Sequence, residues 1–340
     1  MGAGTAQRGA CLLISGKVRK NMEFVVFAGV LLLLFIFMIV QELIQTKNQE
    51  KLFKKYLREN YGKEPPKEYS LERFARLGSY LERHKEEKQL DDITWNDLGM
   101  DEVFRRIDRT YSAAGEEYLY YTLRNISCGR EALEHLEEVV NWLQEQENIK
   151  VRIQLLMKRL GHLGKYSLYD YLDNLDYLGE RSNRKIVLGN LLYLPFLLLL
   201  FVQPAMGTIG IVLCMLWHIM TYFREKKVIE PYIISFAYVL RLIDVCEELE
   251  KQKIPVYRRE LDELREALKS LRELRRGAYW VMAGNQGKIG GNPLDILADY
   301  LRMILHLDIF QFNRMLEKLR KKTGQVETML AITGYLDMAI

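Results

Sequence analysis

Residues 186–223 read IVLGNLLYLPFLLLLFVQPAMGTIGIVLCMLWHIMTYF and carry no charged side chain. As a single helix this stretch would be about 57 Å long, nearly twice the ~30 Å hydrocarbon thickness of a bilayer. Gln203 and Pro204 interrupt it near its middle, and proline removes a backbone donor from a helix. The stretch therefore predicts a transmembrane hairpin that turns at Gln203-Pro204. A buried helical pair in a soluble core is the alternative, but LLYLPFLLLLFV lacks the amphipathic period of such a pair.

Lysine and arginine flank both ends of the hairpin and predict its orientation. The cations before it are Arg181, Arg184 and Lys185, and those after it are Arg224, Lys226 and Lys227. Because cytoplasmic loops carry an excess of Lys and Arg, we expect both ends in the cytoplasm. Asn190, His218 and Thr221 lie within the apolar stretch but near its ends, where we expect water and lipid headgroups to satisfy them.

A second apolar run, FVVFAGVLLLLFIFMIV at residues 24–40, is also long enough to cross a bilayer. A cleaved signal peptide is the rival interpretation, but this run exceeds the ~7 to 15 residues of a typical signal core. We therefore expect an uncleaved anchor. Lysines stand on both sides of it, so charge alone leaves its orientation open, and Met22 is an alternative start of the chain. The expected location is the cell membrane, with several spans and a cytoplasmic helical domain.

The remaining chain is rich in charge and has the periodicity of amphipathic helices. Of 340 residues, 49 are Lys or Arg and 45 are Asp or Glu, so a formal charge of +4 gives no general argument for nucleic-acid binding. Apolar residues recur at spacings of three and four in two segments: Leu133, Leu136, Val140 and Leu143; and Leu261, Leu264, Leu268, Leu271 and Leu274. This spacing predicts helices with one buried face. The expected fold is all-α, with long amphipathic helices and about three transmembrane helices.

The expected organisation has six parts. They are an N-terminal extension (1–22), a transmembrane anchor (23–44), a linker with helices (45–90), a first part of the helical core (91–185), the hairpin (186–223) and a second core and lever part (224–340).

No catalytic or metal-binding pattern stands out in the sequence. The four cysteines include no C-x-x-C pair, and no two of the five histidines stand four residues apart. The glycine-rich stretch 283–293 is not a P-loop, because Gly287-Lys288 is followed by Ile289 where Ser or Thr would hold magnesium. We therefore expect no enzymatic activity from this chain as it stands.

Basic clusters are the candidates for contact with DNA. They consist of Lys251, Lys253, Arg258, Arg259, Arg272, Arg275, Arg276, Arg320, Lys321 and Lys322. Cations of this kind could neutralise backbone phosphates. Glutamates such as Glu263 and Glu266 interleave with most of them, so a solvated helix face with internal ion pairs is the alternative interpretation.

The segment DDITWNDLGMDEVFRRIDRTYSAAGEEYLYYTLR, residues 91–124, resembles the opening of the helical core of MutS-family DNA mismatch repair proteins. The motif residues are Thr110, Gly115, Leu119 and Leu123. Residues 292–319 and 332–340 look like parts of membrane-anchored MutS-like proteins. The resemblance implies a MutS-type helical core, DNA contact, and ATP hydrolysis by a domain that follows the core.

The chain departs from that family in ways that shape the functional expectation. It reaches Ile340 without a P-loop, so we expect a core and lever region that stops before its ATPase domain. ATP and magnesium are expected only if that domain is supplied. The expected partners are the lipid membrane, DNA, and a second copy of the chain or an ATPase-domain partner.

The alternative function is a membrane-bound helical scaffold that binds a protein partner and has no DNA role. A C-terminal apolar stripe, formed by Leu330, Ile332, Leu336 and Ile340, favours it, because an exposed stripe needs a partner. The competing interpretation of this stripe is a helix that docks back on the core.

Overall fold

The computed structural model describes residues 36–41, 43–63, 69, 71–85, 88–126, 129–164, 167–275 and 300–340. The chain divides into two compact units, Met1–Tyr61 and Gly62–Ile340, which are described separately. In the first unit, residues 36–41 and 43–59 are helical. Most of the predicted anchor, the extension 1–22 and the glycine-rich stretch 283–293 lie outside the described residues.

The second unit is helical throughout its described part, which confirms the predicted all-α class. Its α-helices are α2 (Leu71–Arg83), α3 (Asp92–Asp97), α4 (Met100–Ile107), α5 (Ala113–Arg124), α6 (Arg130–Glu145), α7 (Glu147–Leu160), α8 (Leu168–Asp173), α9 (Arg184–Leu191), α10 (Tyr193–Val202), α11 (Pro204–Glu250), α12 (Arg258–Leu271), α15 (Leu307–Arg320) and α16 (Thr323–Met338). Short 3-10 helices are η1 (Asn174–Leu178), η2 (Pro255–Tyr257) and η3 (Arg272–Arg275). The described residues include no strand beyond one isolated bridge between Gln89 and Asn125.

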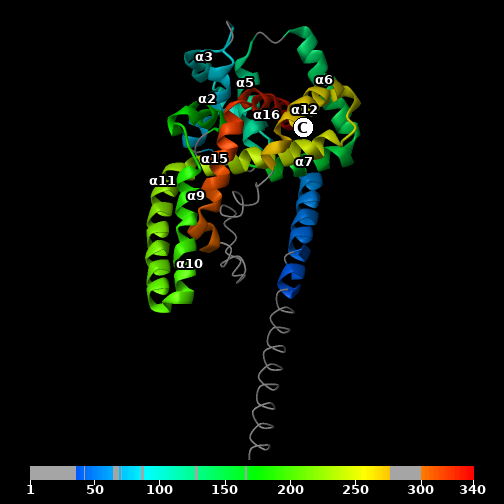
Figure 1. Cartoon of the computed structure of the whole chain (residues 1–340). Coiled ribbons are helices and arrows are strands. Elements are labelled where there is room, and N and C mark those ends of the chain that lie inside the picture. The colour runs from blue at the N-terminus through cyan, green and yellow to red at the C-terminus, as the bar shows by residue number, and fades with distance from the viewer. Residues whose placement is uncertain are drawn as a thin grey trace, which may run out of the picture. The chain divides into compact units, whose positions relative to one another are not determined.

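The predicted hairpin is formed by α9 and α10 packed side by side with the first half of α11 (Figure 1). Gln203 breaks the helix and Pro204 opens the next one, as the sequence indicates. Two glycines let the helices approach closely: a Cβ on Gly207 would lie 2.6 Å from the backbone nitrogen of Leu200, and one on Gly210 would meet the Phe196 ring. Both arms are long and apolar enough to cross a membrane, and Arg184–Val202 is largely exposed.

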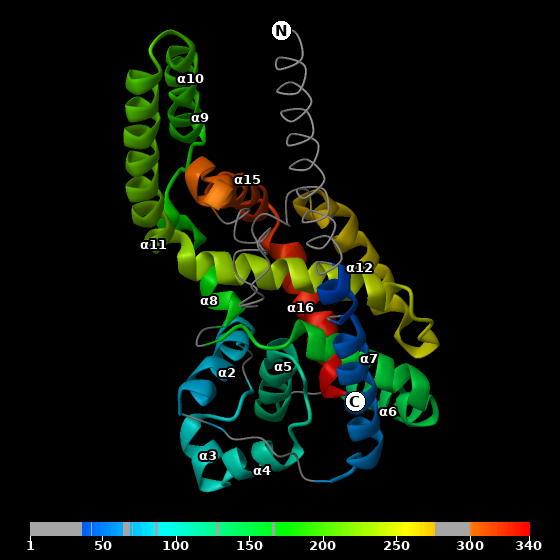
Figure 2. The same cartoon turned by 90° about the horizontal axis from the view of Figure 1, so that it is seen from below.

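Helix α11 does not end at Phe223, where the sequence suggested the end of the span. It runs for 47 residues in all, from Pro204 to Glu250, and passes through Pro231. Its two halves run in different directions (Figures 1 and 2). Proline lacks the N–H that would bond to the carbonyl of Lys227 and crowds that carbonyl, which accounts for a bend without a break.

The second half of α11 lies in the centre of the core. Leu240, Ile243 and Leu249 are buried there, and the helix contacts α7, α12 and α16. Helix α16 in turn packs against α5 and α12 (Figure 2). Leu330, Ile332 and Leu336 are all buried in these contacts, so the docked helix is the correct interpretation of the C-terminal stripe.

The two leucine stripes have different outcomes. All five leucines of the second stripe, on α12 and η3, are buried as predicted. On α6, however, the fully buried residues are Val139 and Leu143, while Leu133 is exposed. Leu136 and Val140 of this stripe are half-buried against the core, so only its first residue, Leu133, lies on the exposed first turn of α6.

Candidate functional site

The predicted basic residues fall into two groups, and the second lies near the C-terminal end of α12. Lys251, Lys253, Arg258 and Arg259 surround the start of α12, and Arg272 follows its end. The second group, at residues 320–322, lies at the C-terminal end of α15, and the Lys322 ammonium donates to the carbonyl of Ser270 in α12. The side chain of Arg275 and the whole of Arg276 lie outside the described residues.

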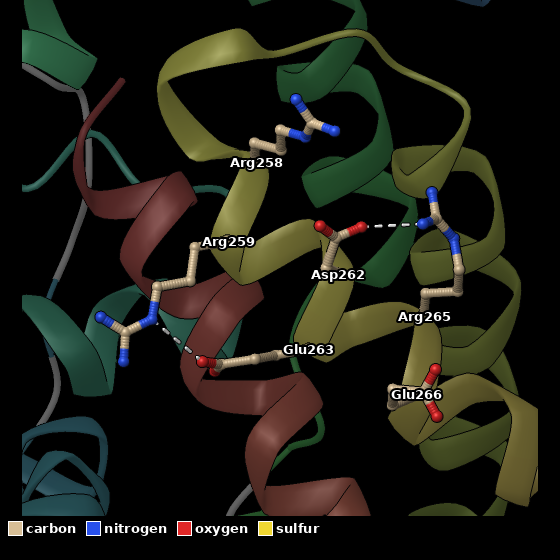
Figure 3. Close-up of a pocket in the computed structure, with 6 residues that line it drawn as sticks. All are labelled: Arg258, Arg259, Asp262, Glu263, Arg265 and Glu266. Atoms are coloured by element: carbon tan, nitrogen blue, oxygen red, sulfur yellow. Dashed lines mark hydrogen bonds and ion pairs between the residues drawn. The ribbon is translucent and has the colours of Figure 1, made fainter.

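A surface hollow on α12 shows how these cations are balanced (Figure 3). Arg259 Nε lies 3.4 Å from Glu263 Oε1, and Arg265 donates to Asp262 Oδ1 at 2.7 Å. Arg265 also donates to Glu250 at the end of α11, at 2.8 Å. The hollow therefore alternates positive and negative charge, as the glutamates in the sequence suggested.

Most of the other candidate cations also have hydrogen-bond or ion-pair partners. Lys251 donates to Glu248 at 2.7 Å, Arg272 lies 3.9 Å from Glu250, and Lys321 lies 3.9 Å from Glu317. Arg320 donates to the carbonyls of Leu175 and Gly179, which makes it a structural clamp. Among the residues that the structure describes, the candidates without a carboxylate partner are Lys253, Arg258 and Lys322, the last of which donates to the Ser270 carbonyl instead.

The MutS-like motif residues build the start of α5. Thr110 donates through its backbone N–H and its hydroxyl to Asp108 Oδ1, at 2.9 and 2.6 Å, which fixes the turn before the helix. Ser112 is the N-cap, and its Oγ accepts from the Gly115 N–H. Leu119 is buried and Leu123 is half-buried on the face below, as helical spacing predicted.

Asp337 of α16 locks this helix start to the C-terminal helix. Its buried carboxylate accepts from the N–H of Tyr111 at 3.1 Å, the N–H of Ser112 at 2.8 Å and the Ser112 hydroxyl at 2.6 Å. A Cβ on Gly115 would lie 2.3 Å from Asp337 Oδ2, and one on Gly334 would lie 2.6 Å from the carbonyl oxygen of Ala114. The motif glycine is therefore required by a close crossing of α5 and α16.

Two buried glutamates extend this arrangement into the core. The fully buried Glu116 binds the guanidinium groups of Arg73 and Arg76, the latter at 2.8 Å. Glu117, 2% exposed, accepts from the Ser167 hydroxyl at 2.9 Å. Burial, the largest cause, raises the pKa of Glu117 to about 8. Two adjacent residues of α5 therefore differ in charge. Glu116 is ion-paired with two arginines, whereas the carboxyl of Glu117 binds a proton near neutral pH.

The three polar residues of the hairpin contact protein groups, a kind of partner that the sequence did not indicate, although Oδ1 of Asn190 is buried without a hydrogen-bond partner among the described residues. Asn190 Nδ2 donates to the carbonyl of Leu305 at 3.1 Å, and Thr221 Oγ1 lies 3.3 Å from His306 Nε2. The rings of His218 and His306 meet with centroids 5.3 Å apart, and His218 Nδ1 lies 3.0 Å from the Cys214 carbonyl. These contacts tie the hairpin to Leu305 and His306, immediately before α15.

His306 lies at the centre of this junction in an unusual conformation. Its φ of 54° is the only positive value at a non-glycine residue in the described chain. Burial, followed by the neighbouring His218, lowers the pKa of His306. Next to it, Asp308 accepts from the Tyr222 hydroxyl at 2.7 Å, and Lys226 donates to the same hydroxyl at 3.1 Å.

The chain matches no family model, no curated protein and no solved structure. Its function must therefore be inferred from its own residues. No three His, Cys, Asp or Glu side chains of the described residues gather as a metal ion would need. Sequence reasoning singled out Gly115, Asn190 and His218, but missed their partners Asp337, Leu305 and His306 because these lie far along the chain.

Proposed function

We propose that this chain is the membrane-anchored core and lever region of a MutS-like protein. In this proposal the core lies in the cytoplasm, where it contacts DNA and an ATPase-domain partner. The chain couples the movement of that partner, and the DNA contact, to a hairpin in the cell membrane. The observation that carries this proposal is α11, which begins at the hairpin turn and then runs through the core. The family part of the proposal rests on the sequence resemblance at Thr110 and Gly115, which build the start of α5.

Packing makes the core end of α11 suited to transmit movement. Its buried residues pack against several other helices, α7, α12, α15 and α16 among them, and closely packed interiors pass displacement on with little compression. Pro231 separates this packed half from the hairpin half. Movement of one half relative to the other would therefore concentrate at the proline, where one helix hydrogen bond is missing.

The lever is tested by measuring the distance between spin labels on the exposed residues Met220 and Lys251 in the full chain in lipid nanodiscs. A straight helix of 31 residues spans about 46 Å. The bend predicts a shorter distance in the wild type and a longer one in Pro231→Ala. Pro195→Ala is the control, because Pro195 lies in the first turn of α10, where proline is tolerated. Equal distances in the wild type and Pro231→Ala would contradict a proline-defined bend.

DNA contact is tested by salt-dependent binding of a duplex to the full chain in the same nanodiscs. Each neutralised phosphate contributes a slope of about −0.9 in log K against log salt. The triple variant K253Q/R258Q/R259Q should make this slope less negative by up to about 3. The control variant R105Q/R106Q/R130Q, which removes three exposed cations elsewhere, should leave the slope unchanged. Absence of binding at 50 mM salt would remove the DNA part of the proposal.

A second candidate function is a membrane-bound scaffold for a protein partner, without a DNA role. The ion pairs of Arg259, Arg265 and Arg272 favour it, since these cations already face carboxylates. Cross-linking in mild detergent followed by mass spectrometry separates the two candidates. A scaffold yields one recurrent protein partner and no DNA binding, and failure to recover such a partner counts against it.

A further inference from the structure

Six cations gather at the base of the hairpin. The flanking segments 179–185 and 224–230 carry six Lys or Arg residues against three glutamates. Arg184, Lys185, Arg224 and Lys227 are exposed, and we refer to these four residues as the collar. Arg181 Nη1 lies 3.2 Å from Glu225 Oε2, an ion pair that joins the two segments and occupies one of the glutamates.

The collar meets a large exposed apolar surface directly. Val187 and Leu188 follow its first two cations, with Leu188 67% exposed. On the other arm, Met220 is 74% exposed and Phe223 immediately precedes Arg224. The far end of the hairpin, around Gln203, has no charged residue at all. The collar therefore stands where hydrocarbon gives way to headgroups, at one end only.

We propose that the collar binds the phosphate groups of anionic phospholipids. The planar guanidinium groups of Arg184 and Arg224 suit bidentate contact with phosphate oxygens, and Lys185 and Lys227 add point charge. Lipid is the occupant, and not free phosphate, because the adjoining apolar surface holds these cations at headgroup depth. This inference rests on the membrane insertion contained in the proposed function, and it names the lipid partner.

The position of the collar bears on the lever. Lys227 lies four residues before Pro231, so it supplies the carbonyl that the proline leaves without a backbone partner. Headgroups bound at Arg224 and Lys227 would hold the hairpin half of α11 immediately before the bend. The core half, beyond Pro231, is then the part that is free to move relative to the membrane.

The test compares the full chain in nanodiscs of phosphatidylcholine with the chain in nanodiscs that also contain phosphatidylglycerol. Lipids that remain bound after detergent extraction are counted by native mass spectrometry. The collar variant R184Q/K185Q/R224Q/K227Q should lose the preference for phosphatidylglycerol, by roughly five-fold per cation at low salt. The control variant R105Q/R106Q/R130Q/K269Q, which loses four exposed cations elsewhere, should keep it.

Each outcome decides the inference. No preference in the wild type, or an equal preference in the collar variant, overturns it. Collar-dependent binding of inorganic phosphate or duplex DNA in phosphatidylcholine nanodiscs, without a lipid preference, also overturns the lipid assignment. Extraction of membranes with alkaline carbonate separates this inference from the proposed function. A chain that is released by carbonate contradicts membrane insertion itself, whereas a retained chain without lipid preference contradicts the collar alone.

Discussion

Glu117→Gln is expected to stabilise the protein at neutral pH. The Glu117 carboxyl is 2% exposed and its pKa is raised to about 8, first by burial and further by the nearby carboxylates Asp170 and Glu116. The hydroxyl of Ser167 and the charge of Arg76 favour the ionised form but do not offset burial. At pH 7 the folded protein therefore holds a proton on Glu117 that the unfolded chain releases.

The sign and size of the effect follow from that difference. The ordinary pKa of the Glu117 carboxyl is 4.5, and its pKa in the folded protein is about 8. At pH values between these two, the folded state binds more protons than the unfolded state, so the free energy of unfolding falls as pH rises. At about 1.4 kcal/mol per pKa unit, the penalty on Glu117 reaches about 3 kcal/mol at pH 7. Glutamine has no proton to lose and keeps an oxygen that accepts from Ser167. The variant should therefore gain about 3 kcal/mol at pH 7 and little at pH 4.5.

Thermal unfolding in nanodiscs at pH 5, 6, 7 and 8 measures this difference. The stability gained by Glu117→Gln should grow steadily over that range. Glu131→Gln, a change at an exposed residue of α6, should show no such growth. A gap between Glu117→Gln and wild type that stays constant with pH would refute the inference that burial keeps Glu117 protonated.

Two further changes probe the motif crossing and the hairpin junction. Gly115→Ala places a Cβ against Asp337 at a close helix crossing and should lower the free energy of unfolding by roughly 2–4 kcal/mol. Gly78→Ala, on α2, adds its Cβ in open space and should instead stabilise the protein by up to about 1 kcal/mol. Thermal unfolding of both variants beside the wild type measures the two effects. His306 has a lowered pKa, so its contribution to stability is present above about 6.5 and is lost as pH falls. His306→Gln should remove that acid sensitivity, most clearly in the Glu117→Gln background; an unchanged acid limb of the stability curve would contradict this assignment.

The parts of the fold that depend on local pattern could be predicted from the sequence. The hairpin followed from an uncharged stretch too long for one span, and its turn from Gln203-Pro204. The buried leucines of α12 followed from spacing alone. The continuation of α11 through Pro231 could not be predicted, because proline usually ends a helix and only the surrounding contacts decide whether the chain bends instead.

For the candidate sites, individual residues could be predicted from the sequence, but their tertiary partners could not. Composition identified the basic residues but could not show that Arg265 would meet Glu250 across two helices. The motif identified Gly115, but the reason for a glycine there is a carboxylate more than 200 residues later, Asp337. Periodicity cannot specify which distant helix fills a gap, so the partner of each site residue had to come from the tertiary structure.

Helix α16 connects the motif to the lever. It crosses α5 at a contact so close that Gly115 and Gly334 have no room for a methyl group, and it also touches the buried half of α11. A displacement of that half of α11 would strain the crossing or the Asp337 hydrogen bonds. The core half of α11 therefore resists movement, and the least costly change is a change of angle at Pro231, next to the hairpin. If the proposed function is correct, a motor or partner acting on the core would thus reorient the core as a unit relative to the hairpin.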